Sequence, residues 1–474
     1  MTVLNDEIVE LPASALAQLV LQGKVSARQV TRSFVDRCEK TDEQLNVFAY
    51  RDFDAAIKQA HFVDRLIAEG RYPGPLAGVP VSVKDLISVQ GVPFALGSRL
   101  FAGEIAKHDA PSVARLRNAG ACILGKTTTS ELGSKAVGHS PLTGHTLNPW
   151  NRVLTAGGSS AGAAAGVATR MFPVALGTDG GGSSRIPASF CGVVGYKPTF
   201  GRIPVWPPSA TPTLAHVGIL GNAVDDIQLL LAVVQGYDRR DPFSYPVGST
   251  AQLYEMRSPI ELSVGWCNAI NDQRADPDVE AIAYEWLEKS VGSGIESFEF
   301  GTEISFRDLW NAEFYGGIKS RLGQLSDSPD LDPSLTLALR ALSPDADQVR
   351  RFGRDRLLAY AVIDAIFDRF DLLCTPCTPT VAPPAGSDQP PGMEHFGAVD
   401  WSYFTYPFNL SGHPAVSVPV GLSEHGLPVG LQIVGRKHDD AKVLAFARFV
   451  EAQVRFSARY RTPSIQSFRN NGFA

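Results

Sequence analysis

A chain of 474 residues with 44% hydrophobic and 19% charged residues can form two or three domains or one large α/β domain, and this composition excludes a disordered or fibrous protein. A formal net charge of −6 without any long run of Lys or Arg argues against a nucleic-acid ligand. The N-terminus carries acids and lacks an apolar core, and no later stretch reads as a membrane span, so we expect a cytoplasmic protein.

The first half of the chain changes from a helical to an alternating pattern. Apolar spacing predicts lead-in helices over residues 1–70, with a break at Gly23. Short Val- and Ile-rich runs bounded by Gly and Pro then occur at residues 78–84, 121–125, 172–177 and 193–197. Because helical stretches lie between these runs, we expect an α/β catalytic core over residues 75–220, with a sheet covered on both faces.

The second half is first more helical and then returns to strands. Residues 225–370 are more charged and include an amphipathic segment that begins at Asp226. Strand signals return in residues 371–455, which end in a helix expected over residues 440–454. Since strand signals occur on both sides of the helical middle, we expect a single α/β/α domain over residues 1–474. Its mixed, twisted central sheet would be built from distant segments rather than from two independent domains.

The cysteines suit reduced thiols better than a disulfide framework, because six of them are scattered over a long chain: Cys38, Cys122, Cys191, Cys267, Cys374 and Cys377. The CxxC spacing of the last two resembles a redox or zinc half-site, but no second CxxC exists. The pair follows an apolar run that begins at Asp371, so we expect a structural strand end. This pair therefore does not predict a metal or redox site.

Two glycine-rich turns that carry serines, residues 155–166 and 177–188, are the most unusual local feature. A phosphate or dinucleotide loop would need GxxxxGK[ST], or GxGxxG after a strand, and neither is present. Close helix packing explains the glycines of the first turn but not the serines beside the tightest turns. Acyl transfer explains both, because a serine on a strained turn needs backbone N–H groups that converge on a carbonyl oxygen.

The second turn provides the candidate nucleophile, Ser183. Residues without Cβ reach positive φ and bring amide donors close to a substrate, and three of them precede this serine: Gly180, Gly181 and Gly182. The G-x-S-x-G motif of α/β-hydrolases is absent here, and spacing alone leaves a distant histidine base open. The other candidate base is Lys84, because burial at the end of an apolar run would lower its pKa. A salt bridge with Asp85 or a solvent-facing strand end is the simpler alternative.

The sequence resembles the amidase signature family. The matching motifs are residues 78–85, 125–132, 147–151, the two glycine-rich turns, 192–199, 407–415 and 426–435. Looser similarity covers about residue 10 to 455. The resemblance implies a cofactor-free Ser-cisSer-Lys triad, with Ser183 as nucleophile, Ser159 as proton relay next to a cis peptide, and Lys84 as the terminal base.

The resemblance also implies supporting roles around this triad. The N–H groups of the three glycines and of Ser183 would stabilise the tetrahedral oxyanion. Asp179 and Arg185 would form a structural ion pair that fixes the loop, and Ser160 would orient Lys84 or Ser159.

Four positions depart from the common pattern of the family. Gly180 replaces a common Thr and could loosen the oxyanion loop, Ser184 replaces Ile and could alter the pocket wall, and Ala161 replaces Gly. His413 stands where many relatives have Gln, as a loop residue or a pocket contact.

The expected activity is hydrolysis of a small or aryl amide, extending to carbamates or esters, because one acyl-enzyme chemistry serves all three. The expected partner is this small-molecule substrate, and a homodimer is possible. One alternative is the glutaminase subunit of a tRNA-dependent amidotransferase, which passes ammonia to a partner protein. Another is a non-catalytic scaffold that keeps the fold. The acyl group stays undetermined.

Overall fold

The computed structural model describes residues 5–248, 262–292, 294–342 and 346–456. The first half contributes strands β1 (Phe48–Arg51), β2 (Pro80–Lys84), β3 (Cys122–Thr127), β6 (Val174–Asp179), β7 (Val194–Lys197) and β8 (His216–Gly221), and a small separate hairpin of β4 (His139–Ser140) and β5 (Gly144–His145). The second half contributes β9 (Val264–Ile270), β10 (Gln273–Arg274), β11 (Ile295–Phe300), β12 (Leu372–Pro376), β13 (Ala415–Leu422) and β14 (Pro428–Gly435).

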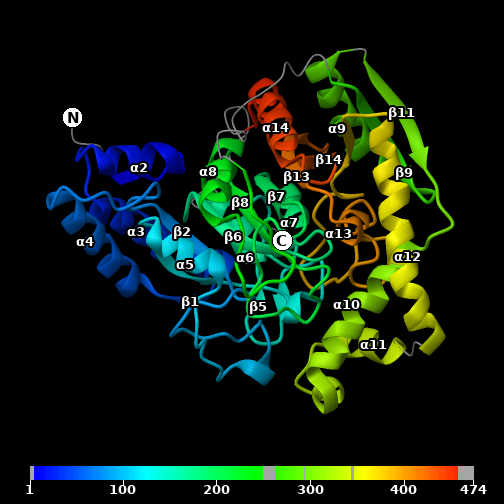
Figure 1. Cartoon of the computed structure of the whole chain (residues 1–474), viewed down its shortest axis with the longest axis horizontal. Coiled ribbons are helices and arrows are strands. Elements are labelled where there is room, and N and C mark those ends of the chain that lie inside the picture. Colours follow the sequence, from blue (N-terminus) through cyan, green and yellow to red (C-terminus); the bar gives the residue numbers. More distant parts are fainter. Residues whose placement is uncertain (1–4, 249–261, 293, 343–345, 457–474) are drawn as a thin grey trace, which may run out of the picture.

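Apart from the hairpin, the twelve strands of the described residues form one mixed sheet (Figure 1). Their order is β1-β3-β2-β6-β8-β7-β13-β14-β12-β9-β10, and β11 pairs with β9. β13 lies beside β7 although more than two hundred residues separate them, so distant segments build this sheet, as the sequence predicts.

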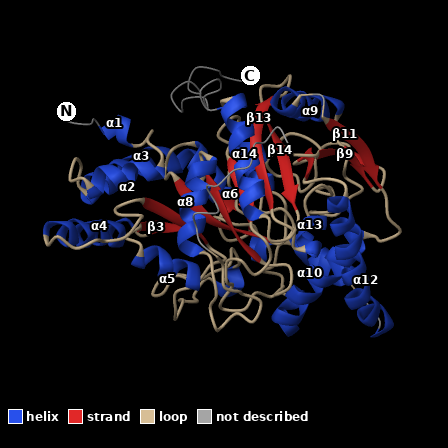
Figure 2. Ribbon diagram, turned by 45° about the horizontal axis from the view of Figure 1, so that its top comes forward, coloured by secondary structure: helices blue, strands red, loops and turns tan. Residues whose placement is uncertain are grey.

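Helices flank this sheet (Figure 2). Those before residue 240 are α1 (Asn5–Ile8), α2 (Ala13–Leu21), α3 (Ala27–Leu45), α4 (Phe53–Ala68), α5 (Pro111–Asn118), α6 (Ala161–Ala168), α7 (Arg185–Cys191) and α8 (Val224–Val234). The later ones are α9 (Pro277–Val291), α10 (Phe306–Leu322), α11 (Pro333–Ala341), α12 (Ala346–Asp364), α13 (Pro407–Ser411) and α14 (Asp440–Val454). None of the helices in these ranges is long and apolar enough to cross a membrane.

Strand β14 shows that helices cover both faces of the sheet. A Cβ placed at Gly430 would meet Ser189 of α7, whereas one at Gly435 would meet Val443 of α14. Residues five apart on a strand point to opposite faces. Helices α7 and α14 therefore lie on opposite sides, and the predicted α/β class with a mixed, covered central sheet is confirmed.

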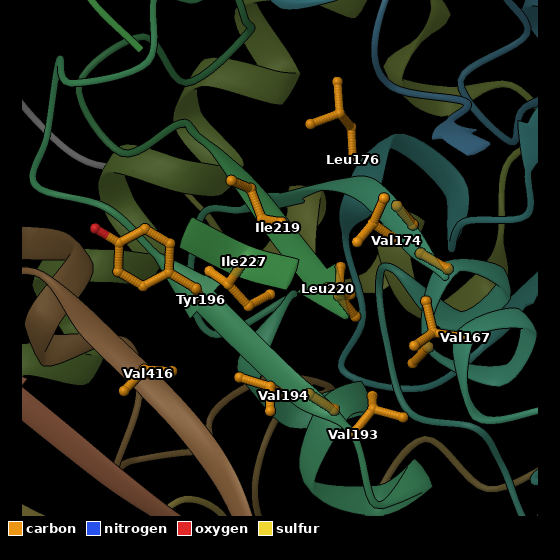
Figure 3. Packing of buried hydrophobic residues seen from close by; sticks show 14 of the residues in the cluster. Val167, Val174, Leu176, Val193, Val194, Tyr196, Ile219, Leu220, Ile227 and Val416 are labelled. Atoms are coloured by element: carbon orange, nitrogen blue, oxygen red, sulfur yellow. The ribbon is translucent and has the colours of Figure 1, made fainter. Parts of the chain in front are cut away.

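Buried aliphatic and aromatic side chains fill the space between these layers. Figure 3 shows Val194 and Tyr196 of β7 beside Ile219 and Leu220 of β8, with Val416 of β13 nearby. These five side chains are fully buried. Because β7 and β8 are buried on both faces, consecutive residues such as Ile219 and Leu220 both contribute to the core.

Four strands were missed in the two segments where the sequence predicts mostly helices. The lead-in region contains β1, which pairs antiparallel with β3. The middle region contributes β9, β10 and β11 to the far end of the sheet. In β11 the polar residues Glu296, Ser297 and Glu299 interrupt the apolar pattern, because much of this strand is exposed. The cysteines are all free and buried, and Cys374 lies in β12, as the strand-end interpretation expects.

Candidate active site

The candidate triad residues come together where two parallel strands end. Strands β2 and β6 pair in parallel, so their carboxyl ends, at Lys84 and Asp179, meet at the same edge of the sheet. Ser159 and Ser160 stand immediately before α6, and the peptide bond from Gly158 to Ser159 is cis. The carboxyl ends of parallel strands are a common position for binding sites, because loops and helix starts converge there.

Three hydroxyl groups surround the amine of Lys84. The Nζ atom lies 2.7 Å from Ser159 Oγ, 2.9 Å from Ser160 Oγ and 2.8 Å from Thr178 Oγ1. Thr178 was missed by sequence reasoning, although it lies in the second glycine-rich turn and two residues before Gly180. The structure thus gives Lys84 a set of neutral partners.

Lys84 is fully buried, and this burial lowers the pKa of its amine well below the ordinary value, against the opposing charge of Asp179. The alternative ion pair with Asp85 is not formed. Asp85 Oδ1 instead accepts from Lys126 Nζ at 3.0 Å. Its surroundings therefore shift Lys84 toward the neutral form, which has two N–H donors and one lone pair.

The hydrogen bonds limit which hydroxyl can donate a proton to that lone pair. Ser160 Oγ donates to the carbonyl of Thr178 at 3.1 Å, so it can only accept from Lys84. Ser159 and Thr178 have no other acceptor for their hydroxyl protons among the described residues. Both hydroxyls line the same cavity as Ser183, and the turn of Ser159 contacts Ser183 directly, because the N–H of Ser160 donates to the carbonyl of Ser183 at 3.1 Å. The arrangement can therefore connect Lys84 to Ser183 through Ser159.

The ion pair predicted between Asp179 and Arg185 is present and fully buried. Arg185 donates to both carboxylate oxygens, at 3.0 and 2.8 Å, and Asn409 Nδ2 adds a bond of 2.9 Å. Burial by itself would raise the pKa of the Asp179 carboxyl, but the charge of Arg185 holds it well below the ordinary value. Arg185 also donates to Gln432 on β14 at 2.7 Å. The pair therefore ties the glycine-rich turn to the far half of the sheet.

The carbonyl groups of the turn are held by donors from distant segments. The carbonyl of Asp179 accepts from Asn409 at 2.9 Å, and that of Gly180 accepts from Trp310 Nε1 at 2.7 Å. Thr405 Oγ1 donates to the carbonyl of Gly181 at 2.6 Å. In a planar trans peptide, the following N–H points opposite to the carbonyl. These contacts therefore set the directions of successive N–H groups.

Three N–H groups of this turn, two of them oriented by these contacts, are left for a ligand. Within the described ranges, no acceptor contacts the N–H of Gly180, Gly181 or Ser183. The N–H of Gly182 instead donates to Asp179 Oδ1 at 2.8 Å. This amide is already occupied, so the predicted set of four oxyanion donors is reduced to three.

The turn opens into a cavity of about 150 Å³. Ser159, Gly180 and Ser183 line it, and no hydrogen-bond partner for Ser183 Oγ is found among the described residues. Most of the other walls are apolar, including Leu86, Phe94, Leu132, Val205, Trp206 and Phe314. The cavity can therefore hold an apolar group with its carbonyl against the N–H donors.

One histidine lines this cavity. The nine histidines all lie in the described ranges, and only His216 is part of the lining. Its Nδ1 faces the carbonyls of Leu214, at 2.8 Å, and Asp179, at 3.1 Å, so Nδ1 carries the proton. Its Nε2 lies 3.5 Å from Lys197 Nζ. Burial, with the charge of Lys197, holds the pKa of this imidazole well below its ordinary value. Both ring nitrogens are engaged, which does not suit a general base.

The family departures mostly lie outside the cavity lining. Ser184 is buried and faces Gly177 and Gly218 of the sheet, so it does not alter the pocket wall. His413 follows α13 and stacks between Tyr360 and Phe367, so it is a buried loop residue rather than a pocket contact. In the described part of the chain, no three His, Cys, Asp or Glu residues are placed to hold a metal ion.

Comparison with protein families and curated relatives gives one consistent result. The family model described as Amidase matches residues 29–308 and 334–444. A glutamyl-tRNA(Gln) amidotransferase subunit of Acidothermus cellulolyticus is 32% identical, over 96% of this chain and 95% of its own. An acylamidase of Rhodococcus erythropolis is 31% identical, over 93% of this chain and 95% of its own.

Solved structures with the same fold have similar lengths. A bacterial aryl acylamidase of the amidase signature family superposes with a TM-score of 0.86 at 28% identity, covering 96% of this chain and 98% of its own. A 6-aminohexanoate cyclic dimer hydrolase gives a TM-score of 0.85 at 27% identity, over 96% and 99%.

Proposed function

The chain belongs to the amidase signature family, and from this membership we propose that it is a serine-dependent amidohydrolase. It cleaves the C–N bond of a small or aryl amide through an acyl-enzyme on Ser183. Family members act on C–N bonds, and the choice of substrate within the family depends on the cavity of each chain. Carbamates and esters fit the same acyl-enzyme chemistry.

The observation that carries this proposal is the buried amine of Lys84 among three hydroxyls, beside the cavity that Ser183 lines. A lysine with a lowered pKa can act as a base when it is neutral. Ser159, at 2.7 Å from that amine, is the connecting hydroxyl. A lysine buried at this depth without a carboxylate partner is costly to keep charged, which favours the form that can accept a proton.

The proposed reaction has two halves. Ser183 Oγ attacks the substrate carbonyl, and its proton passes to Ser159 while the proton of Ser159 passes to neutral Lys84. The tetrahedral oxyanion binds the N–H groups of Gly180, Gly181 and Ser183, each contributing roughly 3–4 kcal/mol in comparable sites. The same relay protonates the leaving nitrogen. Water, activated through that relay, then hydrolyses the acyl-enzyme and releases the acid.

The test is covalent labelling with an aryl sulfonyl fluoride, followed by intact-mass measurement. The wild-type chain should gain one adduct and lose turnover of a small anilide, and Ser183→Ala should lose both the adduct and turnover. Ser209→Ala is the matched control, because Ser209 lines the same cavity. It should keep both the adduct and turnover. Labelling that persists in Ser183→Ala would refute the proposed nucleophile, and an unlabelled wild-type chain would favour a non-catalytic scaffold.

The second candidate is the glutaminase subunit of a tRNA-dependent amidotransferase. Its support is the match along nearly the whole chain to curated relatives that are subunits of glutamyl-tRNA(Gln) amidotransferases. The mostly apolar walls of the cavity suit an apolar acyl group better than the polar glutamine side chain. Glutamine hydrolysis that requires a co-purified second protein would favour the glutaminase, whereas anilide hydrolysis by the isolated chain favours the amidohydrolase.

A further inference from the structure

Helix α10 places two side chains in the cavity lining, Phe314 and Arg321, and a third, Trp310, against the turn beside it. Trp310 donates to the carbonyl of Gly180, and Phe314 lies 3.4 Å from the position that a Cβ at Gly180 would take. Arg321, in the last turn of α10, lines the same cavity. Steps of four and then seven residues keep these side chains on one face of a helix.

The spacing of these residues sets a length. At a rise of 1.5 Å per residue, the Cα of Arg321 lies about 10 Å along the helix axis from that of Phe314. Phe314 is next to the turn that carries the oxyanion donors. The Cα of Arg321 therefore lies on the order of 10 Å from the scissile carbonyl of a bound substrate. The length of the arginine side chain adds to or subtracts from this distance.

The charge of Arg321 has no ion-pair or hydrogen-bond partner within the described ranges. Two other arginines at α10 do have ion-pair partners. Arg307 pairs with Asp308 on the same helix, and Arg356 of α12 pairs with Glu313 of α10. The Arg321 guanidinium carbon instead lies 5.8 Å from the centroid of the Phe101 ring. Arg321 is exposed as a whole residue, so it lies where the cavity meets solvent. Partial desolvation of its guanidinium lowers the pKa, and no neighbouring carboxylate opposes the shift.

The rest of the cavity lining adds no competing negative charge. No Asp or Glu occurs among the described residues that line it, and burial lowers the pKa of its other titratable side chain, His216. The walls between Ser183 and Arg321 are mostly apolar. An isolated guanidinium at the far end of an apolar cavity suits a carboxylate, which accepts two N–H donors from it in a fork geometry.

We propose that the substrate is an amide with a carboxylate at the far end of an apolar spacer, and that Arg321 binds this carboxylate. The inference rests on the proposed amidohydrolase function and narrows its substrate class. It makes Arg321 a residue that determines specificity, with no part in the covalent steps. The carboxylate can belong to the acyl group or to the amine, and the experiment separates these two sources.

The test compares matched substrates with and without the distal charge. The acyl arm pairs the mono-4-nitroanilide of octanedioic acid with octanoyl 4-nitroanilide, and the amine arm pairs N-benzoyl-8-aminooctanoate with N-octylbenzamide. For the correct arm, wild-type kcat/KM should favour the charged member. Arg321→Gln should reduce the charged-to-neutral ratio roughly 10- to 100-fold, and Arg321→Lys should keep part of it. A series of shorter and longer diacids should show an optimum at an intermediate length.

The matched control is Arg307→Gln on the same helix, because Arg307 is half exposed and already paired with Asp308. It should leave the ratio unchanged. A ratio that is the same in wild type and Arg321→Gln in both arms would overturn the proposal.

Failure of the proposed function gives a different pattern, in which no member of either pair is hydrolysed. Calorimetry then decides the role of Arg321 alone. It compares the binding of octanedioate and of N-benzoyl-8-aminooctanoate to Ser183→Ala with their binding to Ser183→Ala/Arg321→Gln. If either ligand binds at least tenfold more weakly to the double variant, the carboxylate site is supported. Equal or undetectable binding in both variants rejects it.

Discussion

Two buried lysines on neighbouring parallel strands have opposite surroundings. Lys84 ends β2 and Lys126 lies in β3, where it pairs with Val83 in the register of the sheet. Both side chains are almost fully buried, and burial lowers the pKa of both amines. Lys126 donates to Asp85 at 3.0 Å, whereas Lys84 contacts three hydroxyl groups.

Because both lysines are equally buried, the difference lies in the group that each amine contacts. This contact separates the candidate base Lys84 from the ion-paired Lys126. A carboxylate at 3 Å stabilises the ammonium form and compensates for its lost hydration. Hydroxyl groups bind a neutral amine as well as a charged one, so they leave the cost of burying the charge uncompensated. Lys84 is therefore suited to accept a proton, and Lys126 is suited to hold the turn that follows β2.

The largest expected effect comes from Lys84→Met. Turnover of an anilide should fall by roughly 10³-fold or more, because the relay loses its terminal base. The free energy of unfolding should change by no more than about 1–2 kcal/mol, since lost hydrogen bonds are offset by relief from burying the amine. Steady-state kinetics and urea unfolding measure the two quantities. Turnover that survives in Lys84→Met would remove the distinction between the two lysines.

Lys126→Met should give the reverse result. It leaves the carboxylate of Asp85 buried without its partner, and breaking such a pair costs about 3–5 kcal/mol. Turnover per folded molecule should stay within a few-fold of wild type. Asp85→Asn combined with Lys126→Met should recover part of the stability, because no charge is then buried. A Lys126→Met chain that is stable yet inactive would assign Lys126 a catalytic role instead.

The pH profile sharpens the same comparison. Lys84 must be neutral to accept a proton, so kcat/KM should rise about tenfold per pH unit and level off above its pKa. Because burial lowers that pKa, the rise should occur at lower pH than for an ordinary lysine. The unfolded chain binds this proton more readily, so stability falls as pH decreases through the lowered pKa. Lys84→Met should remove this loss, measured by unfolding at several pH values.

Trp310→Phe tests whether donors to the backbone carbonyls hold the glycine-rich turn of residues 177–188 in place. The change keeps an aromatic ring and removes the Nε1–H that binds the carbonyl of Gly180. The N–H of Gly181 should lose its fixed direction, and kcat should fall roughly 10- to 100-fold with a smaller change in KM. Trp401→Phe is the control, because it removes an N–H bond to Asp388 instead. Equal losses in both variants would indicate a general packing effect.

Local patterns in the sequence predict the parts of this site that one segment contains. The glycine-rich turns, the strand ending at Lys84 and the helix over residues 440–454 are found as predicted. Contacts that need distant segments were not predictable, because spacing does not place them. The donor from Trp310 and the pairing of Asp85 with Lys126 both depend on tertiary packing. Strand β11 was missed because an exposed edge strand has a weak apolar pattern.

Glu451 on α14 extends the comparison to a partly buried carboxylate that has no ion-pair partner within the described ranges, unlike Asp85 beside Lys126. Both its oxygens accept from the N–H of Val224, at 3.1 and 3.2 Å, and burial raises its pKa to about 8. The folded chain binds this proton more tightly than the unfolded chain, so stability decreases as pH rises toward 8.

Glu451→Gln keeps an acceptor for Val224 and cannot ionise. It should stabilise the chain by about 1 kcal/mol or more at pH 9 and by little at pH 5, as measured by denaturant unfolding at both values. The control is Asp225→Asn, because its ion pair with Arg448 is half exposed and contributes at most about 1 kcal/mol. A Glu451→Gln chain that is no more stable than wild type at pH 9 would mean that water or a cation already compensates this carboxylate. The lack of a charged partner would then not make ionised Glu451 more costly to bury than Asp85.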